Sequence, residues 1–182
     1  MRVPTLLFIV GLLLSCRRPS QNPLSFVREE VDVRVRPGKV EVCGTYHFAC
    51  RTKNPVRAVM FYPFPLDSSL GYPDSVGVSG RDFVPGDSGV RFEVALKPNA
   101  EESVTVFYRQ PVLGRSARYI VTTTQRWHEP IALARFSVTV PTSLAGAALN
   151  YRPDSVTKTE STLTWFFARK RFFPSDDVVV SW

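Results

Sequence analysis

Apolar and polar residues alternate with a period of two along most of this chain. Val31, Val33 and Val35 alternate with charged residues, and the same spacing recurs in later segments. Successive side chains of a β-strand point to opposite faces, so this period indicates strands that each bury one face. The alternation therefore predicts an all-β fold.

Turn signals divide the alternating segments into about ten strands. Fifteen prolines fall mostly between these segments, where they end strands. The segment 143–149 has the only helix-like composition, but it is short and interrupted by Gly146. Many short strands separated by turns predict an Ig-like antiparallel β-sandwich. The main strand segments are 26–36, 39–53, 56–64, 90–96, 104–108, 119–123, 132–140, 163–167 and 178–182.

The first sixteen residues have the pattern of an export signal. Arg2 precedes the apolar run 6–14, and Cys16 follows after one serine. Nine helical residues reach only about 14 Å, about half of a bilayer core, so the run does not span a membrane. The sequence LLLSC, which ends at Cys16, resembles the lipobox of bacterial lipoprotein precursors. That resemblance implies removal of residues 1–15 and a diacylglyceryl group on Cys16.

The lipobox resemblance also implies a domain organisation. It divides the chain into a signal peptide, 1–15, an acylated cysteine with a flexible tether, 16–25, and a β-sandwich, 26–182. A boundary inside the sandwich at 110–117 stays open, because proline and glycine interrupt the strand pattern there. An ordinary secretory signal that contains a cysteine is the alternative interpretation of the N-terminus, but the Ala-x-Ala cleavage pattern is missing.

The resemblance further implies a location in the cell envelope. Two or three acyl chains anchor a protein stably, so the membrane is the expected partner through the lipid on Cys16. Arg17 stands where enterobacterial lipoproteins retained at the inner membrane carry Asp, which favours the outer membrane. The choice between the periplasmic and the surface-exposed side stays open. Arg17 and Arg18 would add attraction to anionic headgroups.

The net charge places few limits on partners. The chain has a formal charge of +7, and removal of residues 1–15, which contain Arg2, leaves +6. The basic residues are scattered among the strand candidates, which is typical of a solvated surface. We expect no nucleic-acid partner.

Cys43 and Cys50 are the remaining cysteines once Cys16 is acylated. Export would permit a disulfide between them. In one continuous strand, 39–53, they would lie about 23 Å apart with side chains on opposite faces, whereas a disulfide needs Cα atoms within about 7 Å. The sequence therefore predicts two unbridged thiols.

A second resemblance covers residues 39–111. The order KVEVCGTYHFACRTKNP, then VMFYPFPLD, then RFEVALKPNAEESVTVFYRQP is similar to the β-sandwich module of vault and inter-α-trypsin proteins. It implies a sandwich. The metal-binding adhesion domain that often follows that module has no room here, so its ligand chemistry does not carry over.

Chemistry-bearing residues do not form a recognisable catalytic pattern. His47 and His128 are the only histidines, and neither has a partner at zinc-ligand spacing. The carboxylate doublets 29–30, 101–102 and 176–177 lie next to turns, where we expect solvated strand ends. We therefore expect no metal, no cofactor and no enzymatic activity. An envelope hydrolase stays a third hypothesis, since catalytic groups can converge without a local signature.

Two groups of aromatic residues are candidate binding surfaces. The segment 165–173 combines aromatics with Arg169, Lys170 and Arg171, which could contact lipid phosphates or an anionic partner. The favoured interpretation is a hairpin tip whose aromatics fill the core. The second group could line a shallow groove for a sugar or an extended peptide, although a structural use is favoured. It consists of Tyr62, Phe64, Tyr72 and Phe83.

These observations lead to a functional hypothesis. We expect a lipid-anchored, non-enzymatic protein of the cell envelope whose sandwich binds another protein or has a structural role. The alternative is a module that binds a glycan or a small amphiphile.

Overall fold

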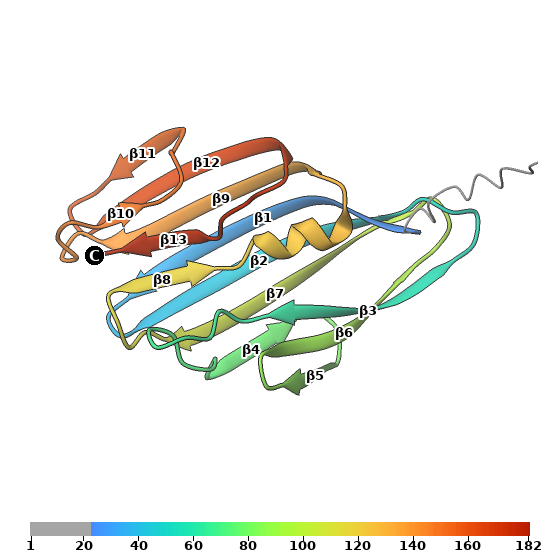
Figure 1. Cartoon of the computed structure of the whole chain (residues 1–182), viewed down its shortest axis with the longest axis horizontal. Coiled ribbons are helices and arrows are strands. Elements are labelled where there is room, and N and C mark those ends of the chain that lie inside the picture. Colours follow the sequence, from blue (N-terminus) through green and yellow to red (C-terminus); the bar gives the residue numbers. More distant parts are fainter. Residues whose placement is uncertain (1–22) are drawn as a thin grey trace, which may run out of the picture.

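A seven-stranded sheet forms one layer of residues 23–182, the part that this computed structural model describes (Figure 1). All neighbouring strands of this sheet run antiparallel except β1 and β9, which are parallel. In spatial order the strands are β11 (Ser155–Lys158), β12 (Thr162–Phe172), β9 (Ile131–Pro141), β1 (Leu24–Arg36), β2 (Lys39–Cys50), β7 (Glu101–Pro111) and β4 (Ser75–Val78).

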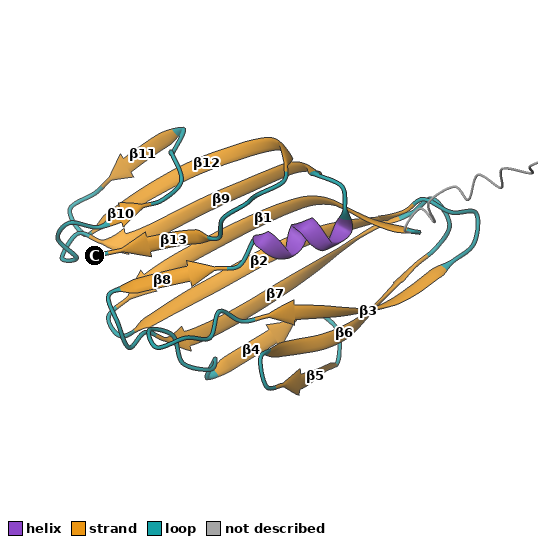
Figure 2. Ribbon diagram, in the orientation of Figure 1, coloured by secondary structure: helices purple, strands orange, loops and turns teal. Residues whose placement is uncertain are grey.

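Two three-stranded antiparallel sheets form the second layer, in front of the large sheet in Figure 2. One contains β10 (Ala148–Leu149), β13 (Val178–Ser181) and β8 (Ser116–Tyr119), and the other contains β3 (Val56–Pro63), β6 (Gly89–Leu96) and β5 (Phe83–Gly86). The predicted all-β sandwich is confirmed. The described residues contain thirteen strands, and the four that the sequence did not predict, β4, β5, β10 and β11, have only two to four residues each and are too short to show alternation.

One hydrophobic core lies between the layers, and it follows from the alternation of the long strands. The inward positions of β1 carry Val31, Val33 and Val35, each at most 4% exposed. The facing positions of β2 and β7 carry fully buried valines such as Val40 and Val104. Each buried valine stabilises the fold by about 1.5 kcal/mol or more, so this alternation holds the layers together.

The helical content differs from the sequence prediction at one place. The segment 143–149, which the sequence marked as too short and interrupted for a stable helix, forms turns that lead into β10. The only helical element of the described residues is a 3-10 helix, η1 (Thr122–Trp127), whose first two residues were predicted to end the strand 119–123. Asp177 accepts hydrogen bonds from the N–H groups of Val121 and Thr122, which satisfies donors at the start of the helix and favours it over a continued β8.

The segment 110–117, which the sequence marked as a potential boundary, joins the two layers. It leads from the end of β7 in the large sheet to β8 in a small sheet. Residues on both sides of it, such as Tyr108 and Tyr119, belong to the same core. The chain changes layers here without leaving that core.

Candidate functional site

A buried carboxyl group faces the core from β1. A β-bulge between Phe26 and Arg28 shifts the register, so that Phe26 and Glu29 both point inward although they are three residues apart. They lie opposite Phe48 and Tyr46 of β2. Only 2% of Glu29 is exposed, and burial raises the pKa of its carboxyl to about 8.

Three tyrosine hydroxyls meet beside this carboxyl. The hydroxyl of Tyr46 lies 2.9 Å from that of Tyr62 on β3 and 2.8 Å from that of Tyr119 on β8. Burial raises the pKa of all three phenols, so they stay neutral. The ring of Tyr46 lies over Gly44, where a Cβ atom would collide with the tyrosine hydroxyl. The two hydrogen bonds of the Tyr46 hydroxyl connect the large sheet to both small sheets.

The buried polar groups border a cavity of about 70 Å³ between the layers. Residues of η1, among them Thr124 and Trp127, form part of its wall. The Oε1 atom of Glu29 is buried there without a hydrogen-bond partner. Most buried polar atoms in proteins have a partner, so a buried carboxyl oxygen without one marks a position where a ligand or water fits. We call this set of groups the Glu29 cavity.

The sequence interpretation of Glu29 was wrong. Glu29 and Glu30 were expected to be a solvated strand end, but they lie within β1, and Glu29 is buried. The alternation of Val31, Val33 and Val35 carried the signal, because its extension by two residues places Glu29 on the inner face.

The other carboxylate doublets have mostly structural contacts. Glu102 pairs with Arg81, and Asp177 binds the start of η1. The side chain of Asp176 accepts a hydrogen bond from the Ser175 hydroxyl, and Glu101 is exposed. Neither doublet places two carboxylates at the Glu29 cavity.

The four aromatics considered as lining of a groove, for which a structural use was favoured, are distributed between core and surface. Tyr62, Phe64 and Tyr72 form a chain of ring contacts with centroid distances of 6.0 and 5.6 Å. Phe64 is 3% exposed, whereas Tyr72 is 42% exposed and donates a hydrogen bond to the carbonyl of Gly86. Phe83 lies on β5 opposite Phe92. The structure thus brings three of the four together, and Tyr62 is the one that lines the Glu29 cavity.

The segment 165–173 lies mostly in β12, not at a hairpin tip as predicted. Its aromatics alternate: Trp165, Phe167 and Phe172 fill the core, whereas Phe166 and Phe173 are exposed.

The basic residues of this segment have different surroundings. Arg169 forms an ion pair with Asp154 at 3.0 Å, and its guanidinium lies over the ring of Phe167. Lys170 and Arg171 are exposed, and Arg171 has a positive φ of 50°. The segment therefore presents two basic side chains to solvent.

The remaining chemistry-bearing residues lie apart from the cavity. Cys43 is exposed and Cys50 is buried, both as free thiols, so the prediction of two unbridged cysteines is confirmed. Within residues 23–182 no three His, Cys, Asp or Glu side chains are grouped to hold a metal ion, and no helix there is long and apolar enough to cross a membrane. Cys16 and the tether up to residue 22 lie outside the described residues.

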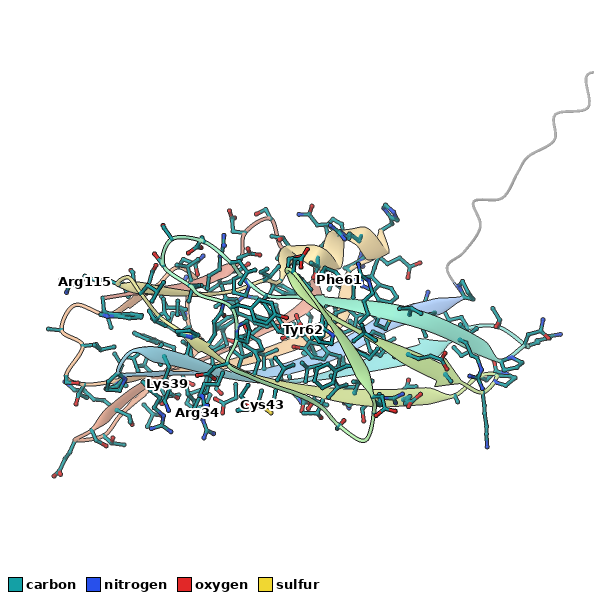
Figure 3. All side chains as sticks on the ribbon, turned by 90° about the horizontal axis from the view of Figure 1, so that it is seen from below. Arg34, Lys39, Cys43, Phe61, Tyr62 and Arg115 are labelled. Carbon is teal, nitrogen blue, oxygen red and sulfur yellow. The ribbon has the colours of Figure 1, made fainter. Side chains whose placement is uncertain are left out.

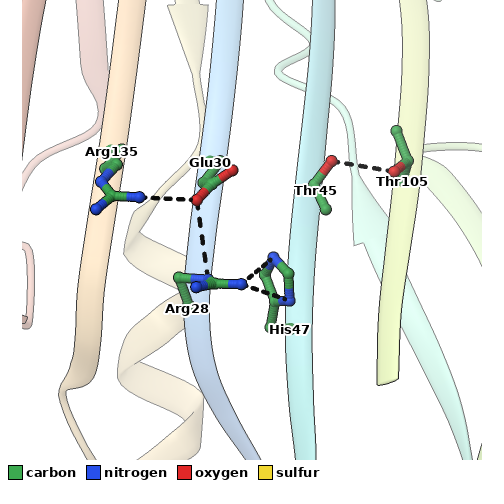
Figure 4. A network of polar contacts seen from close by, with 6 residues as sticks. All are labelled: Arg28, Glu30, Thr45, His47, Thr105 and Arg135. Atoms are coloured by element: carbon green, nitrogen blue, oxygen red, sulfur yellow. Dashed lines mark hydrogen bonds and ion pairs between the residues drawn. The ribbon is translucent and has the colours of Figure 1, made fainter. Parts of the chain in front are cut away.

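The outer face of the large sheet carries a network of charged residues (Figure 4). Arg135 on β9 lies 3.1 Å from Glu30, which also faces Arg28 at 3.8 Å. The guanidinium of Arg28 lies 3.2 Å from both ring nitrogens of His47. Burial, and secondarily Arg28, lowers the pKa of His47. Arg28 and Glu30 thus project away from the core, opposite to Glu29.

A second exposed surface lies on the outer face of the β3–β6–β5 sheet. Phe61, Arg91 and Val84 face each other across the three strands, and the Arg91 guanidinium lies 5.1 Å from the centre of the Phe61 ring. Val84 is 66% exposed and neighbouring Val59 is 71% exposed. Figure 3 shows Phe61 on the opposite side of the molecule from Arg34, Lys39 and Cys43, which lie on the large sheet. We call Val59, Phe61 and Val84 the outer patch.

Comparisons with known proteins give a likeness in fold. No protein-family model matches the chain, and no curated protein matches it in sequence. A crystal structure of a candidate nutrient-binding protein from Legionella pneumophila is similar over 88% of this chain and 67% of its own, with 16% identity and a TM-score of 0.59. At this identity the likeness shows a shared fold alone.

Zinc metallopeptidases of the M1 type share the fold as well. A Deinococcus radiodurans enzyme is similar over 88% of this chain, with 16% identity and a TM-score of 0.53. A two-domain M1 metallopeptidase with bound L-arginine is similar over 87% of this chain, with 17% identity and a TM-score of 0.52. The present chain spans only 43% and 42% of the length of these peptidase chains.

Proposed function

We propose that this chain is a lipid-anchored protein of the bacterial cell envelope whose β-sandwich binds another protein and catalyses no reaction. The outer patch is the observation that carries this proposal. Val59 and Val84 are more than 60% exposed on a regular sheet face, and Phe61 is 39% exposed beside them. Adjacent apolar side chains on a rigid face are typical of a protein-binding surface.

The sheet presents this patch in a fixed geometry. The ion pair between Arg57 and Glu93, at 2.8 Å, borders the patch, and Arg91 stacks on Phe61. Such a surface has an apolar centre and a charged rim, which is the usual anatomy of a protein interface. The fold also occurs in the M1 metallopeptidases as part of a longer chain, which supports a role in contact with other parts of a protein assembly.

The lipid anchor of this proposal depends on Cys16. Leu24, where β1 begins, lies eight positions after Cys16 in the sequence. An extended chain spans at most about 3.5 Å per residue, so the sandwich would lie within roughly 28 Å of an anchored lipid. We further propose the outer membrane as the destination, because Arg17 follows the cysteine. A partner would therefore be a protein close to that membrane.

The binding role is tested with matched surface variants. The tagged full-length protein is cross-linked in cells, extracted with mild detergent, and its partners are quantified by mass spectrometry. We expect Val59→Lys and Val84→Lys to lose a partner that wild type retains. Leu113→Lys is the control, because Leu113 is also 71% exposed but lies after β7, outside the patch. Equal partner recovery with all variants would contradict the proposal.

The anchor is tested separately by metabolic labelling with palmitate. Wild type should incorporate the label and fractionate with membranes, and Cys16→Ser should do neither. Cys43→Ser is the control, because Cys43 is an exposed thiol within β2. Labelling that survives Cys16→Ser would refute the anchor without affecting the test of the outer patch.

A further inference from the structure

The Glu29 carboxyl has no charged partner on its own side of the sheet. Its neighbours Arg28 and Glu30 contact His47 and Arg135 on the opposite face (Figure 4). None of the side chains that line the cavity is Lys, Arg or His, within the part of the chain that the structure describes. A buried carboxylate without a cation is strongly unfavourable, so ionised Glu29 requires a positive group that this lining does not supply.

The cavity limits the size of a group that can supply this charge. Its volume is about 70 Å³, whereas an engineered cavity that holds benzene measures about 150 Å³. A sugar ring or a drug-sized ligand, which needs several hundred Å³, does not fit. The space suits a group of two or three heavy atoms.

The walls favour a cation over a neutral or anionic group. The aromatic rings of Phe26, Phe48 and Trp127 border the cavity and lie 5.4 to 5.8 Å from one another. Aromatic faces carry negative electrostatic potential and attract ammonium groups. The hydroxyl oxygens of Tyr46 and Tyr62 can accept hydrogen bonds from N–H donors. An anion would be repelled by the Glu29 carboxylate and would find no cationic side chain in the lining.

We propose that the Glu29 cavity binds a small organic ammonium group, with the Glu29 carboxylate as counter-ion and the surrounding aromatic rings as walls. The group is a small alkylammonium ion or the ammonium end of a larger amine. The ligand lies between the layers, and the outer patch meets this site only at Phe61, which also lines the cavity.

Binding is coupled to release of a proton. Because the Glu29 carboxyl has a pKa of about 8, it is mostly protonated at neutral pH when no cation is bound. An entering ammonium ion stabilises the carboxylate, and the carboxyl proton passes to solvent. The titratable groups that face Glu29 are Tyr46 from β2, Tyr62 from β3 and Tyr119 from β8, and all three stay neutral in this range. Each binding event below pH 8 should therefore release up to one proton.

The test is calorimetric titration of the full-length protein in detergent with ethylammonium, and with ethanol as the neutral ligand of similar size. We expect saturable binding of ethylammonium alone, with an affinity that rises roughly tenfold per pH unit between pH 6 and 7 and levels off above about pH 8. Titrations in buffers of different ionisation enthalpy measure the released proton directly.

Two variants locate the site. Glu29→Gln keeps the shape of the side chain and should abolish binding, whereas Glu30→Gln, on the opposite face, should leave it unchanged. Circular dichroism checks that both variants fold. The proposal is overturned if folded wild type does not bind ethylammonium at pH 9, or binds it without proton release at pH 6.5. Binding of equal strength in folded Glu29→Gln would also overturn it, since the carboxylate would then not be the counter-ion.

Discussion

The core contains two aromatic clusters that are built differently. In the first, Phe136 and Phe167 stack with ring centroids 4.6 Å apart, and Tyr151 stacks on Phe167 at 5.2 Å. In the second, Tyr46 hydrogen bonds with two other tyrosines beside Glu29 and a cavity. The first cluster has the close packing expected of a structural core. The second keeps a buried acid and empty volume, which a selection for stability alone would remove.

The contrast suggests that the two clusters have different roles within one core. The stacked cluster joins β9 and β12 of the large sheet to Tyr151, before β11. The polar cluster joins the large sheet to both small sheets. We expect the first to hold the fold and the second to lower stability in exchange for a binding site, and the predictions below test this difference.

The largest expected effect is at the stacked cluster. Phe167→Ala removes a ring that is 2% exposed and lies between Phe136 and Tyr151. The lost burial and the cavity left behind should lower the free energy of unfolding by about 4 kcal/mol. Phe166→Ala is the control, because Phe166 is 41% exposed and should cost less than about 1 kcal/mol. Urea denaturation measures both, and similar losses would contradict a structural role for the stack.

The next effect is the pH dependence that Glu29 introduces. The pKa of Glu29 is raised to about 8 in the folded protein from an ordinary value of 4.5. The folded state therefore binds a proton that the unfolded state releases, so stability should fall as the pH rises from about 5 to 8. The expected loss is about 3 kcal/mol.

Urea denaturation without added amine at several pH values measures this loss. Glu29→Gln should remove it and be the more stable protein at pH 8. Glu30→Gln should retain the wild-type slope, because Glu30 is on the solvated face. A wild-type curve that runs parallel to that of Glu29→Gln would contradict the buried acid.

A smaller effect compares one hydroxyl in each cluster. Tyr46→Phe leaves the hydroxyls of Tyr62 and Tyr119 without their shared partner, which should cost about 2 kcal/mol. Tyr151→Phe removes a hydroxyl that donates to the carbonyl of Asp176 at an exposed site, and should cost about 0.5 kcal/mol. Denaturation curves at pH 6 compare the two. Equal losses would show that the hydroxyl of Tyr46 contributes no more to the free energy of unfolding than the hydroxyl of Tyr151.

Local alternation was sufficient to predict most of the fold. The period of two predicted the strands that became β2, β7 and β9, because the burial of each residue depends on its own strand face. It also placed Cys43 and Cys50 on opposite faces, as the structure has them. The parallel pairing of β1 with β9 was not predictable, because no turn between these distant strands fixes their direction.

The Glu29 cavity was harder to predict because it depends on long-range contacts. Tyr46 and Tyr119 are 73 residues apart in the chain, and only the packing of the layers brings their hydroxyls together. The bulge after Phe26 has no sequence signature such as glycine. The inward position of Glu29 followed from the valine alternation, but its charge was taken as a sign of exposure. A buried charge within a regular pattern is thus the informative exception.

The smallest effect on stability concerns the two thiols, which report where the core opens first. Cys43 is exposed on the outer face, whereas Cys50 is 3% exposed on the inner face of β2, two residues after Phe48 of the Glu29 cavity. Cys43→Ser should change stability by less than about 0.5 kcal/mol and leaves Cys50 as the thiol to follow. If the polar cluster is the weaker one, Cys50 should react with a thiol reagent faster than global unfolding allows, yet far more slowly than Cys43 does in Cys50→Ser. If Cys50 is labelled only at the rate of global unfolding, the polar cluster does not open before the rest of the core, and its stability is no lower than that of the stacked cluster.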